Sequence, residues 1–273
     1  MIIDLKRNTK KIPVPASGLR VKKNSIYEPN QLNDFKISRG KFSDYLTCQR
    51  CFYMDRVAGL DTPKTPGWSL NTTTDYLLKK EFDYCRKLQK PHRLFLENGL
   101  DHYVPFQHED MDKWRDSLHA GLSIRYKNSN IILTGGVDDI WQDTKTKQLI
   151  IVDYKSQAQN GEINIYDYLK DPFHKGYKTQ MDFYAYLLTK MGYKVSSNSY
   201  FLVCNANRQK EKFNKVMHFD EYLIPYEWNI DWIEEKIDQM ITVMNSHDIP
   251  AANPCCRNCA YSEQFSKRCN SMQ

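Results

Sequence analysis

Two apolar runs separated by a short polar stretch lie between Ile131 and Lys155, and this pattern predicts two β-strands joined by a turn. Helical spacing of apolar residues predicts helices over 38–57, 70–88, 176–193 and 228–244. Two further strands are predicted over 199–207 and 214–227, separated by a charged turn. Because strands and long helices are interspersed along the chain, we predict an α/β fold.

Acidic residues stand at the ends of the two strands in the 131–155 stretch. Asp138 lies near the end of the first strand, and Asp153, Tyr154 and Lys155 close the second. Two partly desolvated carboxylates repel unless a cation lies between them, so we predict Mg²⁺ or Mn²⁺ bound by Asp138, Asp153 and the backbone carbonyl of Tyr154. Lys155 projects to the same side as Asp153 and would assist an attacking water or balance charge on a phosphate. In a regular strand Asp139 points to the opposite face.

Three short motifs occur in a fixed order: Gly-Val-Asp ending at Asp138, Asp-Tyr-Lys at 153–155, and Gln180 followed by Tyr184 on a predicted helix. This order resembles the core of the PD-(D/E)xK nuclease superfamily, in its RecB-type branch. The resemblance implies a three-layer α/β/α core with a central mixed sheet, and metal-dependent hydrolysis of DNA phosphodiesters. It also implies that Gln180 and Tyr184 help to position the nucleophile and the DNA backbone.

Asp75 occupies the place where the resembled family often has a His or Glu on the helix that precedes the sheet. The resemblance makes Asp75 a candidate third or indirect metal ligand. The alternative is a residue of the first helical turn, where the macrodipole favours an acidic side chain.

Eight cysteines are present, and Cys48 with Cys51 and Cys256 with Cys259 form Cys-x-x-Cys pairs. This spacing favours metal ligation in a reducing compartment over a disulfide framework. The tail resembles RecB-type exonucleases of CRISPR and recombination systems, in which one N-terminal and three C-terminal cysteines hold a 4Fe-4S cluster. Two ligand sets stay open: Cys48, Cys256, Cys259 and Cys269, or both pairs with Cys51 as a ligand, which would suit structural Zn²⁺ as readily. Either metal would close the two ends of the chain over the core.

The 273-residue chain is 41% hydrophobic and 26% charged, which is ordinary for a globular protein, and its formal net charge is +6. The sign suits a partner that carries phosphate, although charge alone does not establish one. We expect no membrane segment and no signal peptide, and therefore a cytoplasmic protein. We predict a basic extended arm over 1–37, a nuclease core over 38–247, and a cysteine-rich metal-binding tail over 248–273 that packs with the 38–57 helix.

Together these observations predict a Mg²⁺- or Mn²⁺-dependent deoxyribonuclease, specifically a RecB-like exonuclease of DNA repair, recombination or defence. Its expected partners are DNA and other proteins of a repair or defence complex. One alternative is a catalytically silent nuclease-like module that binds DNA or protein and is stabilised by a Zn or Fe-S site. A second alternative is a structural metal-binding protein in which the acidic hairpin is incidental.

Overall fold

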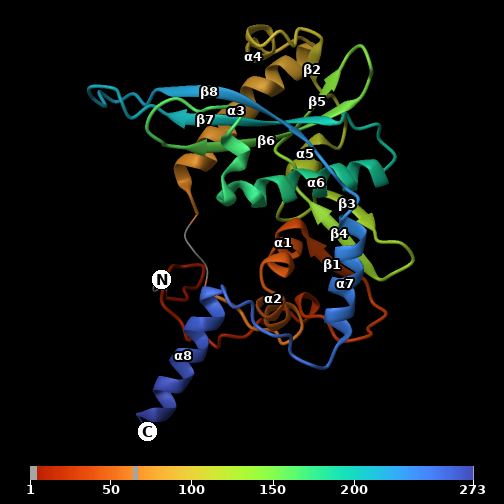
Figure 1. Cartoon of the computed structure of the whole chain (residues 1–273), viewed down its shortest axis with the longest axis vertical. Coiled ribbons are helices and arrows are strands. Elements are labelled where there is room, and N and C mark those ends of the chain that lie inside the picture. The colour runs from red at the N-terminus through yellow and green to blue at the C-terminus, as the bar shows by residue number, and fades with distance from the viewer. Residues whose placement is uncertain (1–4, 64–66, 273) are drawn as a thin grey trace. The chain divides into compact units, whose positions relative to one another are not determined.

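The structure, a computed structural model, describes residues 5–63 and 67–272 (Figure 1). By internal contacts the chain forms two compact units. We call residues 68–124 and 133–233 the sheet unit, and residues 1–67, 125–132 and 234–273 the cysteine unit. Among the described helices, none is long and apolar enough to cross a membrane.

The sheet unit is built on a five-stranded mixed sheet of order β2-β5-β6-β7-β8. Its strands are β2 (Tyr103–Pro105), β5 (Asp139–Asp143), β6 (Leu149–Gln157), β7 (Asn198–Ala206) and β8 (Phe219–Glu227). β6 and β7 are parallel, and the other neighbouring pairs are antiparallel. Helix α6 (Lys175–Lys190) lies in the crossover between the two parallel strands, as such a connection requires (Figure 1).

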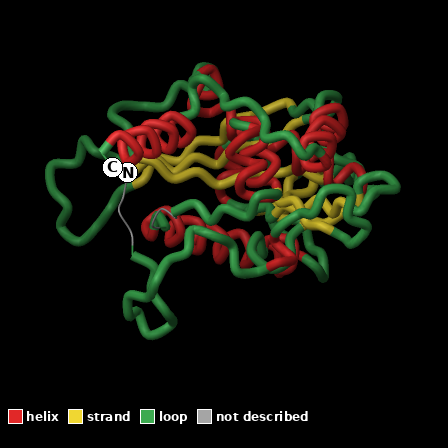
Figure 2. The backbone as a smooth tube through the Cα atoms, turned by 90° about the horizontal axis from the view of Figure 1, so that it is seen from below, coloured by secondary structure: helices red, strands yellow, loops and turns green. Residues whose placement is uncertain are grey.

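Helices cover both faces of this sheet. On one face, Ile150, Val152 and Tyr154 of β6 pack in a buried cluster with Leu78 and Phe82 of α3 (Ser69–Leu88). The residues between them point to the other face, where Asp153 contacts α6 through Gln180. The sheet unit is therefore a three-layer α/β/α structure, and the long strands stand out in yellow among the red helices of Figure 2.

The remaining elements of the chain are short or belong to the cysteine unit. Helices α4 (Arg93–Glu97) and α5 (Met111–Arg115) and the 3-10 turns η2 (Tyr168–Lys170) and η3 (Pro172–His174) lie in the sheet unit. The cysteine unit contains η1 (Lys23–Ser25), β1 (Phe35–Ser38), α1 (Arg39–Thr47), α2 (Gln49–Arg56), α8 (Arg257–Ser271) and all but the first residue of α7 (Ile233–Asn245). Strands β3 (Leu122–Arg125) and β4 (Ile131–Gly135) pair in a second sheet of order β1-β4-β3.

Two predicted elements differ from the structure for local reasons. The strand expected to lead into Asp138 is divided into β4 and β5, which belong to different sheets. The first strand ends at Gly135, and the next residue, Gly136, packs so closely against Ser117 that an added Cβ would lie 2.5 Å from the Ser117 Cβ. The helix predicted over 38–57 is broken at Cys48, whose backbone is extended with φ −156° and ψ 106° and which caps α2.

The segment 5–37, predicted as an extended arm, is folded. Residues 6–14 form a small hairpin with a bridge between Arg7 and Pro13. Further along, Leu19 bridges to Leu60, and η1 and most of β1 follow. Backbone hydrogen bonds therefore attach the basic segment to the rest of the cysteine unit.

Candidate active site and cysteine cluster

Strand β6 places Asp153 and Lys155 on the face of the sheet that α6 covers. The Asp153 side chain is fully buried and forms an ion pair with the Lys155 ammonium group. Its Oδ1 accepts a hydrogen bond from Gln180 Nε2, which also lies 3.2 Å from the Tyr184 hydroxyl oxygen. The structure thus brings together four of the predicted site residues, with Gln180 in contact with a carboxylate.

Asp138 reaches the same place from the loop before β5. Its Oδ2 accepts a hydrogen bond of 2.8 Å from the backbone N–H of Tyr154, the residue between Asp153 and Lys155. Burial, with the nearby Asp153 carboxylate as the second cause, raises the pKa of Asp138 to about 7. Two carboxylates in this arrangement are stabilised by a bound cation.

Asp75 on α3 adds a third carboxyl group. Its Oδ2 accepts from Lys79 Nζ at 2.9 Å, whereas its buried Oδ1 has no hydrogen-bond partner among the described residues. Burial raises the pKa of Asp75, and the charge of Asp138 raises it further. A buried carboxylate oxygen without a partner is costly, so this oxygen is available for a cation or a water.

Comparison with known proteins gives the family. The sequence profile of the PD-(D/E)XK nuclease superfamily matches residues 68–264. The chain belongs to the PD-(D/E)XK nuclease superfamily. Among solved structures, a protein of Eubacterium rectale named "Putative exonuclease" is 15% identical, with 83% of this chain and 87% of that chain covered and a TM-score of 0.42. No curated protein matches the sequence.

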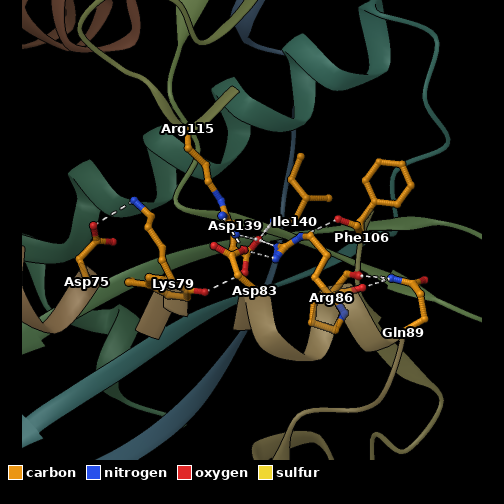
Figure 3. Close-up of polar contacts among 11 residues, drawn as sticks. Asp75, Lys79, Asp83, Arg86, Gln89, Phe106, Arg115, Asp139 and Ile140 are labelled. Atoms are coloured by element: carbon orange, nitrogen blue, oxygen red, sulfur yellow. Dashed lines mark hydrogen bonds and ion pairs between the residues drawn. The ribbon is translucent and has the colours of Figure 1, made fainter. Parts of the chain in front are cut away.

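In this member of the PD-(D/E)XK nuclease superfamily, Asp139 has a different environment from its neighbour Asp138. It is completely buried on the α3 side of the sheet, where it forms ion pairs with Arg86 and Arg115 (Figure 3). It also accepts a 2.8 Å hydrogen bond from the Tyr154 hydroxyl. Although burial opposes ionisation, the guanidinium groups of Arg115 and Arg86 hold the pKa of Asp139 below its usual value. The carboxylate of Asp139 is therefore already neutralised by protein groups.

Sequence reasoning did not identify this arginine network. Arg86 is a buried cation that follows Leu78 and Phe82 at helical spacing on α3, and it also pairs with Asp83. Arg115 pairs with the same Asp83 at 2.8 Å (Figure 3). The only signal in the sequence was a charged residue on an apolar helical stripe.

A ring stack next to Lys155 was also missed. The Lys155 ammonium lies 4.5 Å from the centre of the Tyr177 ring, within the range of a cation–π interaction. Tyr177 stacks on His174 at 4.8 Å, and His174 stacks on Tyr168 at 4.2 Å. The ring of Tyr177 is thus a second partner that holds the Lys155 side chain in place.

Four cysteines of this nuclease-superfamily chain converge in the cysteine unit. The Sγ atoms of Cys48, Cys51, Cys256 and Cys259 all lie within 4.8 Å of one another, and no other group of three or more potential ligands in the described residues meets this criterion. Burial favours the neutral Cys48 thiol, but backbone hydrogen bonds from Asn253 and Cys51 outweigh burial and lower the pKa of Cys48 to about 7. Thiolates in such a group bind a soft or borderline metal.

Cys269 lies outside this group. It is exposed and stands ten residues beyond Cys259 on the continuous helix α8. Ten residues of α-helix span about 15 Å, so Cys269 cannot reach a metal that Cys259 binds. The structure therefore brings together the set with Cys51, not the set with Cys269.

Proposed function

We propose that this chain is a Mg²⁺- or Mn²⁺-dependent deoxyribonuclease, and specifically a RecB-like exonuclease. The observation that supports this proposal most directly is the convergence of Asp138, Asp153 and Lys155 in a chain of the PD-(D/E)XK nuclease superfamily. By the resemblance of its motifs, we propose DNA repair, recombination or defence as its setting, with other proteins of such a complex as partners.

The acidic residues fit a hard divalent cation. Asp138 and Asp153 would hold the ion together with the backbone carbonyl of Tyr154, and the unpartnered Oδ1 of Asp75 is a further ligand or an acceptor for a ligated water. A bound Mg²⁺ or Mn²⁺ would polarise the scissile phosphate and acidify the attacking water. Asp139, already paired with two arginines, contributes to the site by fixing β5 and the Tyr154 side chain.

The other residues hold and balance these charges. Lys155 lies within reach of Asp153 and would stabilise negative charge that develops on the phosphate during cleavage. Gln180 donates to Asp153, so it orients a ligand carboxylate as well as the substrate. Tyr184 lies beside Gln180 and keeps the amide in that orientation.

Lys155→Ala tests the catalytic proposal. We expect the loss of this ammonium group to reduce metal-dependent cleavage of linear DNA by at least about 100-fold without loss of the fold. Lys145→Ala, an exposed lysine on the turn between β5 and β6, is the matched control and should cleave at the wild-type rate. Wild-type activity in the Lys155 variant would remove it from the mechanism.

The choice of DNA substrate separates exonuclease from endonuclease activity. A RecB-like exonuclease should degrade linear DNA and spare circular and end-blocked DNA in the same buffer. Cleavage of the circle would replace the exonuclease proposal with an endonuclease. No cleavage of any DNA by the wild-type protein in Mg²⁺ or Mn²⁺ would overturn the proposed activity.

For the cysteine cluster we propose a structural Zn²⁺ ion in preference to the 4Fe-4S cluster. The Sγ of Cys51 lies 3.5 Å from those of Cys256 and Cys259, and that of Cys48 lies 3.7 Å from Cys259. Four thiolates about 2.3 Å from one tetrahedral ion lie roughly 3.8 Å apart. Each thiolate of a 4Fe-4S cluster binds a different iron, which spreads the sulfurs farther apart. Metal analysis and the visible spectrum of the purified protein test this assignment.

A further inference from the structure

The two units differ sharply in charge. The cysteine unit has 19 Lys and Arg against 11 Asp and Glu, a formal net charge of +8. The sheet unit has 20 basic and 22 acidic residues and a formal net charge of −2. The whole basic surplus of the chain therefore lies in the unit that does not contain the candidate active site. The net charge of the cysteine unit attracts a polyanion, whereas the net charge of the sheet unit does not.

Much of this surplus of basic residues is concentrated in the segment of residues 5–27. This segment contains seven basic residues, Lys6, Arg7, Lys10, Lys11, Arg20, Lys22 and Lys23, and no Asp or Glu. Surfaces that serve solubility intersperse both signs of charge, whereas the charged residues of this segment are all basic over 23 consecutive positions. In the described part of the chain, no acidic side chain forms an ion pair with Lys6, Lys10 or Lys11, and all three are exposed.

The backbone that carries these lysines is ordered by its own hydrogen bonds. Val14 N–H donates to Lys6 O, Asn8 N–H donates to Ile12 O, and Lys11 N–H donates to Asn8 O, each at 2.9 Å. The Asn8 side chain caps the turn by accepting from the backbone N–H of Lys10 and Ile12. We call residues 6–14 the basic hairpin. Its lysines are presented on a defined turn, so less backbone entropy is lost when they bind a partner.

The chain beyond the basic hairpin is anchored to the helical part of the same unit. Arg20 N–H donates to Gly59 O and Asp61 N–H donates to Gly18 O, both at 2.8 Å. The Arg20 guanidinium also forms an ion pair with Asp55, a buried residue of α2. These contacts connect the basic segment to α2, which carries Cys51 of the cysteine cluster.

We propose that the basic hairpin is a nucleic-acid-binding surface that contacts the phosphate backbone of the DNA substrate, separate from the active-site residues. This inference rests on the proposed deoxyribonuclease function, since that function supplies the polyanion. Lysines and exposed backbone N–H groups bind phosphates without reading sequence. The hairpin would therefore raise affinity for DNA of any sequence, and the affinity would fall steeply with salt.

The test is a triple variant, Lys6→Gln, Lys10→Gln and Lys11→Gln, compared with wild type in DNA binding. Binding of a short fluorescein-labelled DNA duplex and of its single strand is measured by anisotropy without divalent metal, over a series of salt concentrations. Each lost phosphate contact lowers the slope of log Kd against log salt by about one, so the slope should fall by about three. At 0.1 M salt we expect Kd to rise roughly tenfold or more.

The matched control is Lys145→Gln, Lys147→Gln and Lys194→Gln, which removes three exposed lysines from the sheet unit. Lys147 and Lys11 both have positive φ, near 63° and 62°, so each triple variant places one glutamine in the left-handed region of the backbone. The control should retain the wild-type Kd and salt slope. Circular dichroism and thermal unfolding establish that both variants are folded.

The inference would be overturned if the hairpin variant bound DNA as tightly as wild type, or if both triple variants lost DNA affinity equally. If the wild-type protein bound polyglutamate as tightly as it binds DNA, the hairpin would be assigned to acidic proteins, and the inference would again be overturned. Because binding is measured without metal, failure of the proposed nuclease activity is a separate outcome. A protein that binds DNA through the hairpin and cleaves nothing would refute the nuclease proposal alone.

Discussion

The adjacent residues Asp138 and Asp139 should respond in opposite directions to the same substitution. In the metal-free protein, the pKa of Asp138 is about 7 instead of 3.8 because of burial and the Asp153 charge. This difference corresponds to about 4 kcal/mol of folding free energy lost when the carboxyl group ionises. Since the Asp138 side chain is only partly buried, solvent screening reduces the expected cost to about 2 kcal/mol. Asp138→Asn should therefore stabilise the metal-free protein at pH 8.

The pH dependence follows from the same shift. Between about pH 4 and pH 7, the folded wild type binds more protons at Asp138 than the unfolded chain does, so its stability falls as the pH rises through this window. Asparagine does not titrate, so the gain from Asp138→Asn should be largest near pH 8 and vanish near pH 4. A gain of about 2 kcal/mol corresponds to a rise in Tm of about 5 °C for a chain of this size.

The assay is thermal unfolding without added divalent ions, repeated with Mg²⁺. Magnesium should stabilise the wild type and not the Asp138 variant, which reverses their order. Asp139→Asn is the matched control: it removes the partner of Arg86 and Arg115 and should destabilise the protein by about 3 kcal/mol. Equal stability of wild type and Asp138→Asn at pH 8 without metal, or a gain from Asp139→Asn, would refute the reasoning.

Two further predictions concern the ring beside Lys155 and the cysteines. Tyr177→Leu removes the ring under the Lys155 ammonium and should lower kcat for DNA cleavage about tenfold. Tyr177→Phe keeps the ring, so its kcat should stay within about twofold of wild type. Equal kcat values in the two variants would exclude a role for the ring. Cys51→Ser should reduce the content of the metal that we propose for the cluster and lower the Tm by roughly 5 °C or more. Cys269→Ser should change neither, as metal analysis and calorimetry would determine. A Cys269 variant that loses its metal would contradict the ligand set described above.

The sequence predicted the sheet unit well because its long strands are apolar runs and its long helices have apolar residues at helical spacing. The period of two along β6 placed Asp153 and Lys155 on one face, and the same rule separated Asp138 from Asp139. The structure adds the reason for the separation, since Asp139 faces α3 and its arginines. That Asp138 binds the metal stays a prediction.

Other features depended on contacts between distant parts of the chain. The pairing of Arg86 and Arg115 with Asp139 joins residues 53 and 24 positions away and leaves no local pattern. The inclusion of Cys51 and exclusion of Cys269 follow from a helix break at Cys48 and an unbroken α8, neither of which the cysteine spacing indicates. The basic hairpin has no apolar periodicity that would predict it, because its turn is held by backbone hydrogen bonds and by the Asn8 side chain.

The four clustered cysteines have a consequence for synthesis on the ribosome. Cys48 and Cys51 emerge early, but their partners Cys256 and Cys259 follow only after some 200 intervening residues, which include the whole five-stranded sheet. Domains generally fold as they emerge from the ribosome, so the sheet can fold before Cys256 and Cys259 have been synthesised. Metal binding would then follow the folding of the sheet, and a nascent chain arrested before Pro254 would have a complete sheet and an unfinished metal site.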